Sequence, residues 1–368
     1  MSTDAAPLPF ARDRLATPAL VLDLPALTRN IATMAAWARG SGIALRPHAK
    51  THKSAEIAHR QVAAGAVGVC CAKLGEAEAL AAAGIDDILL TSPVVSAGAV
   101  ERLAALSGRM RRLAVVVDHP DNLARIAASG AGIDVLVDID PGSHRTGVTS
   151  PKAAVALARA IQGTERLRYR GVQFYCGTLQ HIATREARHA ALAERTTYLS
   201  TVLDALAGAD LPATTVTGGG TGSFVIDAEL GVLTEVQPGS HVFMDAQYGA
   251  CDPAGPSFET SLAIDARVIS ANHSGRVTID AGLKAMATEA GPAKVLAGAD
   301  PASAFLFMGD EHGMLVTPSG AHDPALDDRI ALIAPHCDPS VNLYDRYAVC
   351  EGQTVVAFWP VTARGRSS

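Results

Sequence analysis

Eight short β-rich runs alternate with Ala-rich stretches over the first two thirds of the chain, and this alternation constrains the fold more than any other feature. The stretches between them, such as 74–84, 121–130, 151–162 and 185–207, are long enough for crossover helices. Eight strand–helix repeats are the number that closes a parallel barrel. The runs are 43–48, 67–72, 87–91, 113–118, 134–139, 169–175, 214–218 and one within 235–243.

An open, doubly wound sheet can show the same alternation, so the positions of the polar residues are needed to distinguish the two folds. They follow the ends of separate runs, as a barrel site requires, whereas an open sheet gathers them near one switch point. The sequence therefore predicts an α/β fold with a TIM-type (β/α)8 barrel. The polar residues that follow the ends of the runs are Lys50, Asp118, Arg145, Tyr175, the cluster from Gly218 and Gln237.

The pattern changes after about Tyr248, where strand-like runs follow one another without helical spacers. This texture predicts a smaller C-terminal all-β domain. We expect a barrel at residues 17–247 and a β-domain at 248–368, with residues 1–16 packing on the β-domain. The runs are 261–268, 276–280, 304–308, 329–335 and 354–360.

Composition limits the classes of partner. Of the 368 residues, 48% are apolar and 18% charged, which suits a globular chain with a large core. The formal net charge of −6 gives no reason to expect binding to nucleic acid or to an anionic membrane. No apolar run reaches spanning length, and no export signal is recognisable at the start. We expect a cytoplasmic protein that acts on a small molecule.

Lys50 lies in a basic segment, directly after the first strand-like run. A lysine attacks a carbonyl only as the neutral amine, and the neighbouring Arg46, Lys53 and protonated His48 and His52 are expected to lower its pKa. The segment thus indicates Schiff-base chemistry, with a solvated basic turn as the alternative.

A glycine-rich segment, 218–223, follows the apolar run 213–216. Glycines let backbone amides approach an anion closely, so the segment is a candidate phosphate site. It is not a dinucleotide fingerprint, because Ser223 stands where the third glycine would be, and no P-loop lysine follows. A flexible loop is the alternative.

His336 and Asp338 form a second candidate site near the C-terminus. In an extended segment they would share one face, and Cys337 would point away. Imidazole and carboxylate together suit a divalent cation, and two ligands leave positions open for substrate. A hydrogen-bonded surface pair is the alternative.

Several ordered stretches carry a family resemblance: 17–23, 46–53, 65–70, 218–223, 237–240, 280–282, 311–313 and 336–339. Together they resemble the D-threonine aldolase and D-serine dehydratase family of fold type III enzymes, whose barrel is similar to the N-terminal domain of alanine racemase. The resemblance covers the chain from about Thr17 to Arg364.

This resemblance implies pyridoxal phosphate on the barrel and a catalytic divalent metal held by the β-domain. Mn²⁺ is the foremost candidate, with Mg²⁺, Co²⁺ or Zn²⁺ as alternatives. Lys50 matches the Schiff-base position, and His336 and Asp338 match the metal ligands. The other implied cofactor contacts are Arg145, Tyr175, Thr217, Gly219, Gly220, Thr221 and Gln237.

One departure within the family favours an aldolase. The dehydratases present His-x-Cys to zinc, whereas this chain has Asp338 in the second ligand position. We expect cleavage of a β-hydroxy-D-amino acid, such as D-threonine, to glycine and an aldehyde. The catalytic base would be His52, His181 or a water on the metal.

Other activities stay open from the sequence. They are a D-3-hydroxyaspartate aldolase, a D-serine or D-3-hydroxyaspartate dehydratase, an amino-acid racemase and a non-catalytic cofactor carrier. We expect a homodimer.

Overall fold

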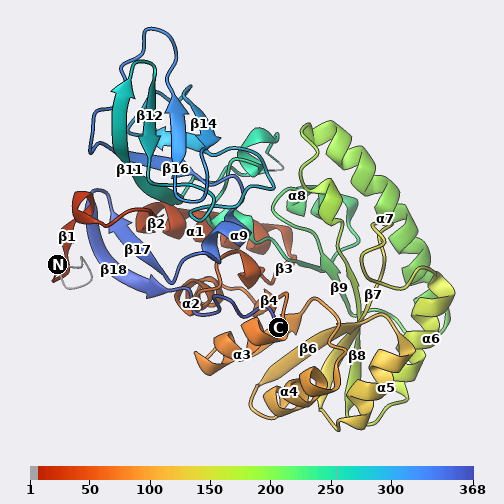
Figure 1. Cartoon of the computed structure of the whole chain (residues 1–368). Helices are drawn as coiled ribbons and strands as arrows, with labels where there is room; N and C mark the ends of the chain where they lie inside the picture. The colour runs from red at the N-terminus through yellow and green to blue at the C-terminus, as the bar shows by residue number, and fades with distance from the viewer. Residues whose placement is uncertain (1–6, 254) are drawn as a thin grey trace.

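The computed structural model describes residues 7–253 and 255–368, which form a parallel barrel and an antiparallel sheet side by side (Figure 1). Within the described residues, no helix has the length and apolar character needed to cross a bilayer.

The eight expected barrel strands are all present, and every neighbouring pair in their sheet is parallel. The sheet runs in the order β3-β10-β9-β8-β7-β6-β5-β4, and a parallel bridge between His48 and Cys70 joins its two ends into a ring. The TIM-type barrel is confirmed. Its strands are β3 (Ala44–Leu45), β4 (Val69–Cys71), β5 (Asp87–Leu90), β6 (Arg112–Val117), β7 (Ile133–Asp138), β8 (Leu167–Phe174), β9 (Thr215–Gly218) and β10 (Glu235–Val236).

The helices cover the outside of the barrel because each presents an apolar stripe to it. In the sixth helix, Ala154, Leu157, Ala158 and Ile161 are buried at helical spacing, and the Ser150 side chain caps the first turn. The helices are α1 (Leu24–Ser41), α2 (Ala55–Ala63), α3 (Leu74–Ala82), α4 (Ala97–Ser107), α5 (Pro120–Ala128), α6 (Pro151–Gln162), α7 (Arg185–Gly208) and α8 (Phe224–Leu230).

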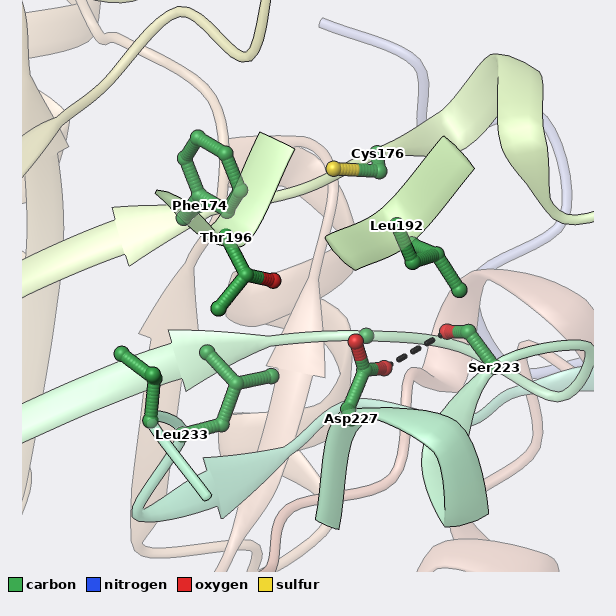
Figure 2. A pocket seen from close by; sticks show the side chains of 9 residues that line it. Phe174, Cys176, Leu192, Thr196, Ser223, Asp227 and Leu233 are labelled. Atoms are coloured by element: carbon green, nitrogen blue, oxygen red, sulfur yellow. Dashed lines mark hydrogen bonds between the residues drawn. The ribbon is translucent and has the colours of Figure 1, made fainter. Parts of the chain in front are cut away.

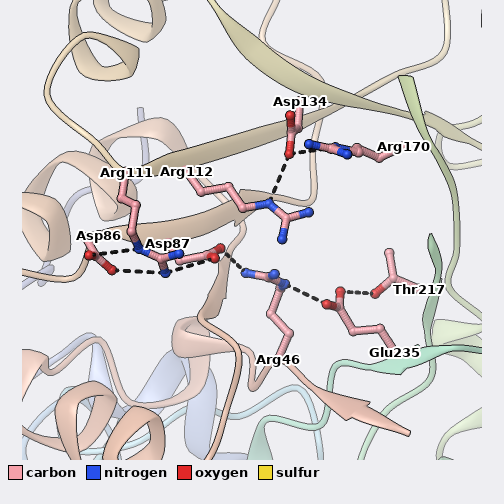
Figure 3. Close-up of polar contacts among 9 residues, drawn as sticks. All are labelled: Arg46, Asp86, Asp87, Arg111, Arg112, Asp134, Arg170, Thr217 and Glu235. Atoms are coloured by element: carbon pink, nitrogen blue, oxygen red, sulfur yellow. Dashed lines mark hydrogen bonds and ion pairs between the residues drawn. The ribbon is translucent and has the colours of Figure 1, made fainter. Parts of the chain in front are cut away.

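An ionic layer closes the amino-terminal end of the barrel (Figure 3). Buried Arg46 donates to Asp87, the first residue of β5, at 2.6 Å and to Glu235, the first residue of β10, at 3.0 Å. Thr217 donates to the other oxygen of Glu235 at 2.8 Å. Arg46 is thereby turned toward the end of the barrel opposite the strand ends that carry the polar residues.

The all-β region is a sheet, antiparallel except for the pair β17–β2, with the strand order β1-β18-β17-β2-β11-β12-β15-β14, and β16 pairs with β11 and β13. Strands β1, β2, β13, β15 and β17 were not expected from the sequence. The strands are β1 (Phe10–Ala11), β2 (Ala19–Asp23), β11 (Leu262–His273), β12 (Arg276–Ile279), β13 (Lys294–Ala297), β14 (Ala304–Phe307), β15 (Gly313–Val316), β16 (Arg329–Ile333), β17 (Arg346–Glu351) and β18 (Thr354–Pro360).

Strand β2 belongs to this sheet, although the sequence grouped it with the barrel from residue 17 onward. It pairs antiparallel with β11 and parallel with β17. β1 pairs with β18, so the described residues before 17 also contact this region. The division at 247/248 stays a prediction.

The two units share one apolar core cluster. Leu27 and Ile31 of α1 and Ile57 of α2 pack in the same cluster as Ile264 of β11 and Leu332 of β16. This shared core holds the edge of the barrel against the antiparallel sheet, so that groups from both can meet in one site.

Candidate active site

A pocket opens at the carboxyl ends of the barrel strands. Because parallel strands end at the same rim, loops that follow distant strands bring their side chains together there. Four of the predicted cofactor residues line this pocket: Lys50, Arg145, Tyr175 and Gln237.

Lys50 is placed by a short 3-10 turn, Ala49–Thr51, which follows β3. The His48 side chain accepts a hydrogen bond from the Lys50 amide at 3.4 Å and fixes the start of the turn. Lys50 Nζ lies 6.0 Å from the centroid of the Tyr175 ring, and the Arg145 guanidinium lies 5.4 Å from that centroid. The tyrosine ring is thus contacted by two cations.

The charge on Lys50 is set by a residue of the other unit. Burial lowers the pKa of Lys50, but Asp338, whose Oδ2 lies 3.5 Å from Nζ, counteracts burial, and the net result is a raised pKa. The expected lowering by neighbouring cations was wrong. Arg46 is turned to the other end of the barrel, Lys53 pairs with Glu76, and burial lowers the pKa of His48 so that it stays neutral.

His336 and Asp338 approach each other, but not on an extended segment as expected. A short helix, α9 (Cys337–Val341), begins between them, with His336 at its N-cap. His336 Nε2 lies 3.8 Å from Asp338 Oδ1, a buried oxygen for which the described residues supply no hydrogen-bond partner. Cys337 is buried, and its amide donates to Asp245 at 3.0 Å.

His181 lies beside this pair. Its ring packs against Tyr248, with 4.4 Å between centroids, and its buried Nε2 has no partner among the described residues. Burial first, and then the neighbouring His336, lower the pKa of His181 to about 4, so its ring is neutral near pH 7. A neutral imidazole with an unused nitrogen can accept a proton.

His52, the other candidate base, is also within electrostatic range of Asp338, and burial lowers its pKa to about 4. It is fully buried, its Nδ1 accepts a hydrogen bond from the Ser54 amide, and its Nε2 contacts Gln61 Oε1 at 3.2 Å. Both ring nitrogens are therefore occupied. The structure brings Lys50, His181, His336 and Asp338 together, and His52 differs from His181 in that both of its ring nitrogens have partners.

The donors around Asp338 fit a divalent ion with two protein ligands. No group of three or more His, Cys, Asp or Glu able to hold a metal occurs in the described part of the chain. The unpartnered oxygen of Asp338 and Nε2 of His336 nevertheless face each other across 3.8 Å. Nitrogen and oxygen donors of this kind suit Mn²⁺, Co²⁺ or Zn²⁺.

The glycine loop, residues 218–223, follows β9, and the buried carboxyl group of Asp227 holds it in place. Figure 2 shows Ser223 donating to Asp227 at 2.7 Å, and the Gly220 amide donates to the same serine oxygen at 3.0 Å. Burial raises the pKa of Asp227 to about 7. Gly219 adopts φ +67°, and a Cβ there would overlap Asp227 Oδ2, so only glycine fits without strain.

The remaining predicted cofactor residues do not line this pocket: Thr221 and Gly219 line two other cavities. Thr221 accepts a hydrogen bond from the His241 amide at 3.1 Å, which ties the glycine loop to the segment after β10. Gln237 donates to Thr217 at 2.9 Å, and Thr217 itself is fully buried below the pocket. Thr217 thus supports Gln237 rather than lining the pocket.

Several site residues were not expected from the sequence. Gln180 donates to Ser223 and accepts from the Gly222 amide, and Asp245 anchors the start of α9. Glu289 contacts the ring of His336. No local motif marks these residues, because their partners lie more than 40 positions away in the sequence.

The geometry agrees with comparisons to known proteins. Residues 22–247 match the family model of the alanine racemase N-terminal domain, and residues 261–350 match a putative serine dehydratase domain. The chain belongs to the fold type III pyridoxal-phosphate family that shares these two domains. The resemblance drawn from the sequence is confirmed.

Relatives of this family with assigned reactions are similar over nearly the whole chain. A D-threonine aldolase of Arthrobacter sp is 40% identical over 96% of this chain and 94% of its own length. A 3-hydroxy-D-aspartate aldolase of Paracoccus denitrificans (strain Pd 1222) is 37% identical, covering 95% and 92%. The crystal structure of D-threonine aldolase from Filomicrobium marinum superposes with a TM-score of 0.92 at 40% identity, covering 97% of both chains. The chain is therefore an enzyme of lyase type.

Proposed function

We propose that this protein is a metal-dependent pyridoxal-phosphate aldolase that cleaves a β-hydroxy-D-amino acid, D-threonine in the first place, to glycine and an aldehyde. One observation carries the proposal. The amine of Lys50 lies 3.5 Å from Asp338, one of the two candidate metal ligands, so the two expected reaction centres are adjacent.

The pocket residues fit pyridoxal phosphate. Lys50 lines the pocket, Tyr175 and Arg145 lie beside it, and the glycine loop at the end of β9, whose Gly220 amide is bonded to Ser223, would bring backbone close to a phosphate. The cofactor supplies an electron sink for negative charge at the substrate Cα. Lys50 and Arg145 place positive charge where an anionic amino acid would bind.

The β-domain residues would control the substrate hydroxyl. A divalent ion on His336 and Asp338 would supply Lewis acidity, which lowers the pKa of that hydroxyl. His181, neutral and with a free Nε2 beside the pair, is our candidate for the base that accepts the hydroxyl proton as the Cα–Cβ bond breaks. His52 is less suited, because both of its ring nitrogens already have partners.

Two alternatives have support in the comparisons. The 37% identity to a 3-hydroxy-D-aspartate aldolase supports a substrate with an acidic side chain. The match to a putative serine dehydratase domain supports loss of the β-hydroxyl as water. Mn²⁺ as the native metal, the cytoplasmic location and the homodimer stay predictions.

The test is a product assay with purified protein, pyridoxal phosphate and Mn²⁺. We expect acetaldehyde and glycine from D-threonine, loss of turnover after EDTA treatment, and recovery on adding Mn²⁺. Lys50→Ala should lose both turnover and the yellow colour of lysine-linked cofactor. Formation of 2-oxobutanoate and ammonia would assign the protein as a dehydratase instead of an aldolase. Faster cleavage of D-3-hydroxyaspartate than of D-threonine would assign D-3-hydroxyaspartate as the substrate.

A further inference from the structure

A carboxylate outside the predicted metal pair contacts His336. Glu289 Oε1 lies 2.8 Å from His336 Nδ1, on the side of the ring opposite Nε2. Since Nδ1 already has this partner, Nε2 is the nitrogen left to face Asp338 Oδ1 at 3.8 Å. No motif in the sequence marks Glu289.

The segment that carries Glu289 is held at two further points, one on α9 and one just after it. The Ala287 amide donates to Ser340 Oγ at 3.0 Å, and that hydroxyl donates to the backbone oxygen of His336 at 2.6 Å. Tyr344 donates to the backbone oxygen of Ala285 at 2.7 Å. Three contacts within five residues therefore hold the carboxylate against the histidine ring before any ligand arrives.

We propose that Glu289 is a positioning residue that orients His336 for the metal. A carboxylate at one ring nitrogen fixes the tautomer with the proton on that nitrogen, and it makes the other nitrogen a stronger donor to a cation. The inference rests on the proposed metal use and adds a residue to it. Glu289 itself does not touch the ion or the substrate.

The experiment measures metal affinity directly, without turnover. Full-length protein with bound pyridoxal phosphate is stripped with EDTA, dialysed and titrated with Mn²⁺, and the free ion is followed by its EPR signal. Glu289→Ala should bind Mn²⁺ about 10- to 100-fold more weakly than the wild type. Glu289→Gln keeps a hydrogen-bonding oxygen without the charge, so it should lose less affinity than Glu289→Ala.

Glu259→Gln is the matched control. Glu259 is exposed to a similar extent, 52% of its side chain against 54% for Glu289, and it is also paired, with Arg29. It should bind Mn²⁺ like the wild type. Thermal unfolding of the metal-free proteins should be alike for all three variants and the wild type, because a purely structural role for Glu289 would lower stability rather than metal affinity.

The outcomes separate this inference from the proposed function. If the wild type binds Mn²⁺ no better than His336→Ala, the proposed metal site fails. If the wild type binds Mn²⁺ better than His336→Ala, and both Glu289 variants match the wild type, only the role of Glu289 fails. An equal loss of Mn²⁺ affinity in Glu259→Gln would also overturn the role of Glu289, because a general effect of protein charge would then explain the weaker binding.

Discussion

Lys50 is a residue on which two opposing influences act. Burial favours its neutral form, while Asp338 favours the ammonium form and prevails. A cation held by Asp338 would compensate the charge of that carboxylate and leave the effect of burial, which lowers the pKa of Lys50. A metal ion bound at Asp338 would therefore be coupled to the protonation of Lys50 through a single carboxylate.

The two candidate bases can be separated by matched substitutions. His181→Gln should lower kcat with D-threonine by about 10²- to 10⁴-fold, the usual contribution of a general base. His52→Gln should lose thermal stability, because it disturbs a fully buried side chain with two partners, but it should retain kcat within a few-fold. Steady-state kinetics measure kcat of both variants, and thermal unfolding measures their stability.

The pH profile adds a second readout for His181. In the proposed role the neutral imidazole accepts the proton, and a pKa of about 4 means that this form prevails at every pH above that value. Protonation of His181 should therefore cause no fall in kcat between pH 8 and pH 5. A larger loss of kcat in His52→Gln than in His181→Gln would assign the catalytic base to His52.

Single residues differ in how far the sequence could reveal them. Lys50, His336 and Asp338 stand in local motifs, so they could be proposed without coordinates. Asp245 and Glu289 could not, because each acts through a contact made only after α9 has folded against distant segments. The direction of the Lys50 pKa was missed for the same reason, since its strongest partner lies in the other unit.

At the scale of elements, the turn between β9 and α8 offers a test of cofactor binding. Gly219→Ala should release pyridoxal phosphate, because the added Cβ would overlap Asp227 and displace the loop backbone. Cofactor content after dialysis, read from the visible absorption, measures the effect.

Gly231, at the other end of α8, provides the control. It has nearly the same backbone angle, φ +70° against +67°, but a Cβ there would meet nothing within 4 Å. Both alanine variants should lose about 1–2 kcal/mol of stability from the left-handed conformation. If Gly231→Ala releases as much cofactor as Gly219→Ala, backbone strain alone explains the loss.

Helices and strands could be predicted where their pairing partners are close in the sequence. They were missed or misassigned where the partners are distant. The barrel strands follow one another in sequence, so the alternation of strand and helix revealed all eight. β2 pairs with strands more than 230 residues away, and no pattern within 19–23 distinguishes the two sheets. α9 was expected to be extended, because a five-residue helix is too short to show periodicity.

The whole molecule should unfold as one unit. The shared core cluster joins α1 and α2 to the antiparallel sheet, and the Tyr347 hydroxyl of β17 donates to the backbone oxygen of His52 at 2.5 Å. The chain has two tryptophans, one in each unit. Trp37 of α1 packs on Phe224 of α8, and Trp359 of β18 lies under the Arg60 guanidinium of α2.

Single-tryptophan variants test this coupling. Trp37→Phe and Trp359→Phe each leave one fluorophore, and urea unfolding of each variant should give a fluorescence midpoint that coincides with that variant's far-ultraviolet circular dichroism midpoint. Fluorescence midpoints displaced in opposite directions from circular dichroism would show that the barrel and the antiparallel sheet unfold separately.

The ring of strands has its fewest paired residues beside Lys50. β3 contributes only two residues to its pairing with β10, and one residue pair, His48 with Cys70, completes the circle toward β4. Local opening needs the least free energy where few backbone bonds hold a strand. Local opening of this join would loosen the rim of the barrel beside Lys50 while the arginine–carboxylate layer at the opposite end keeps its contacts.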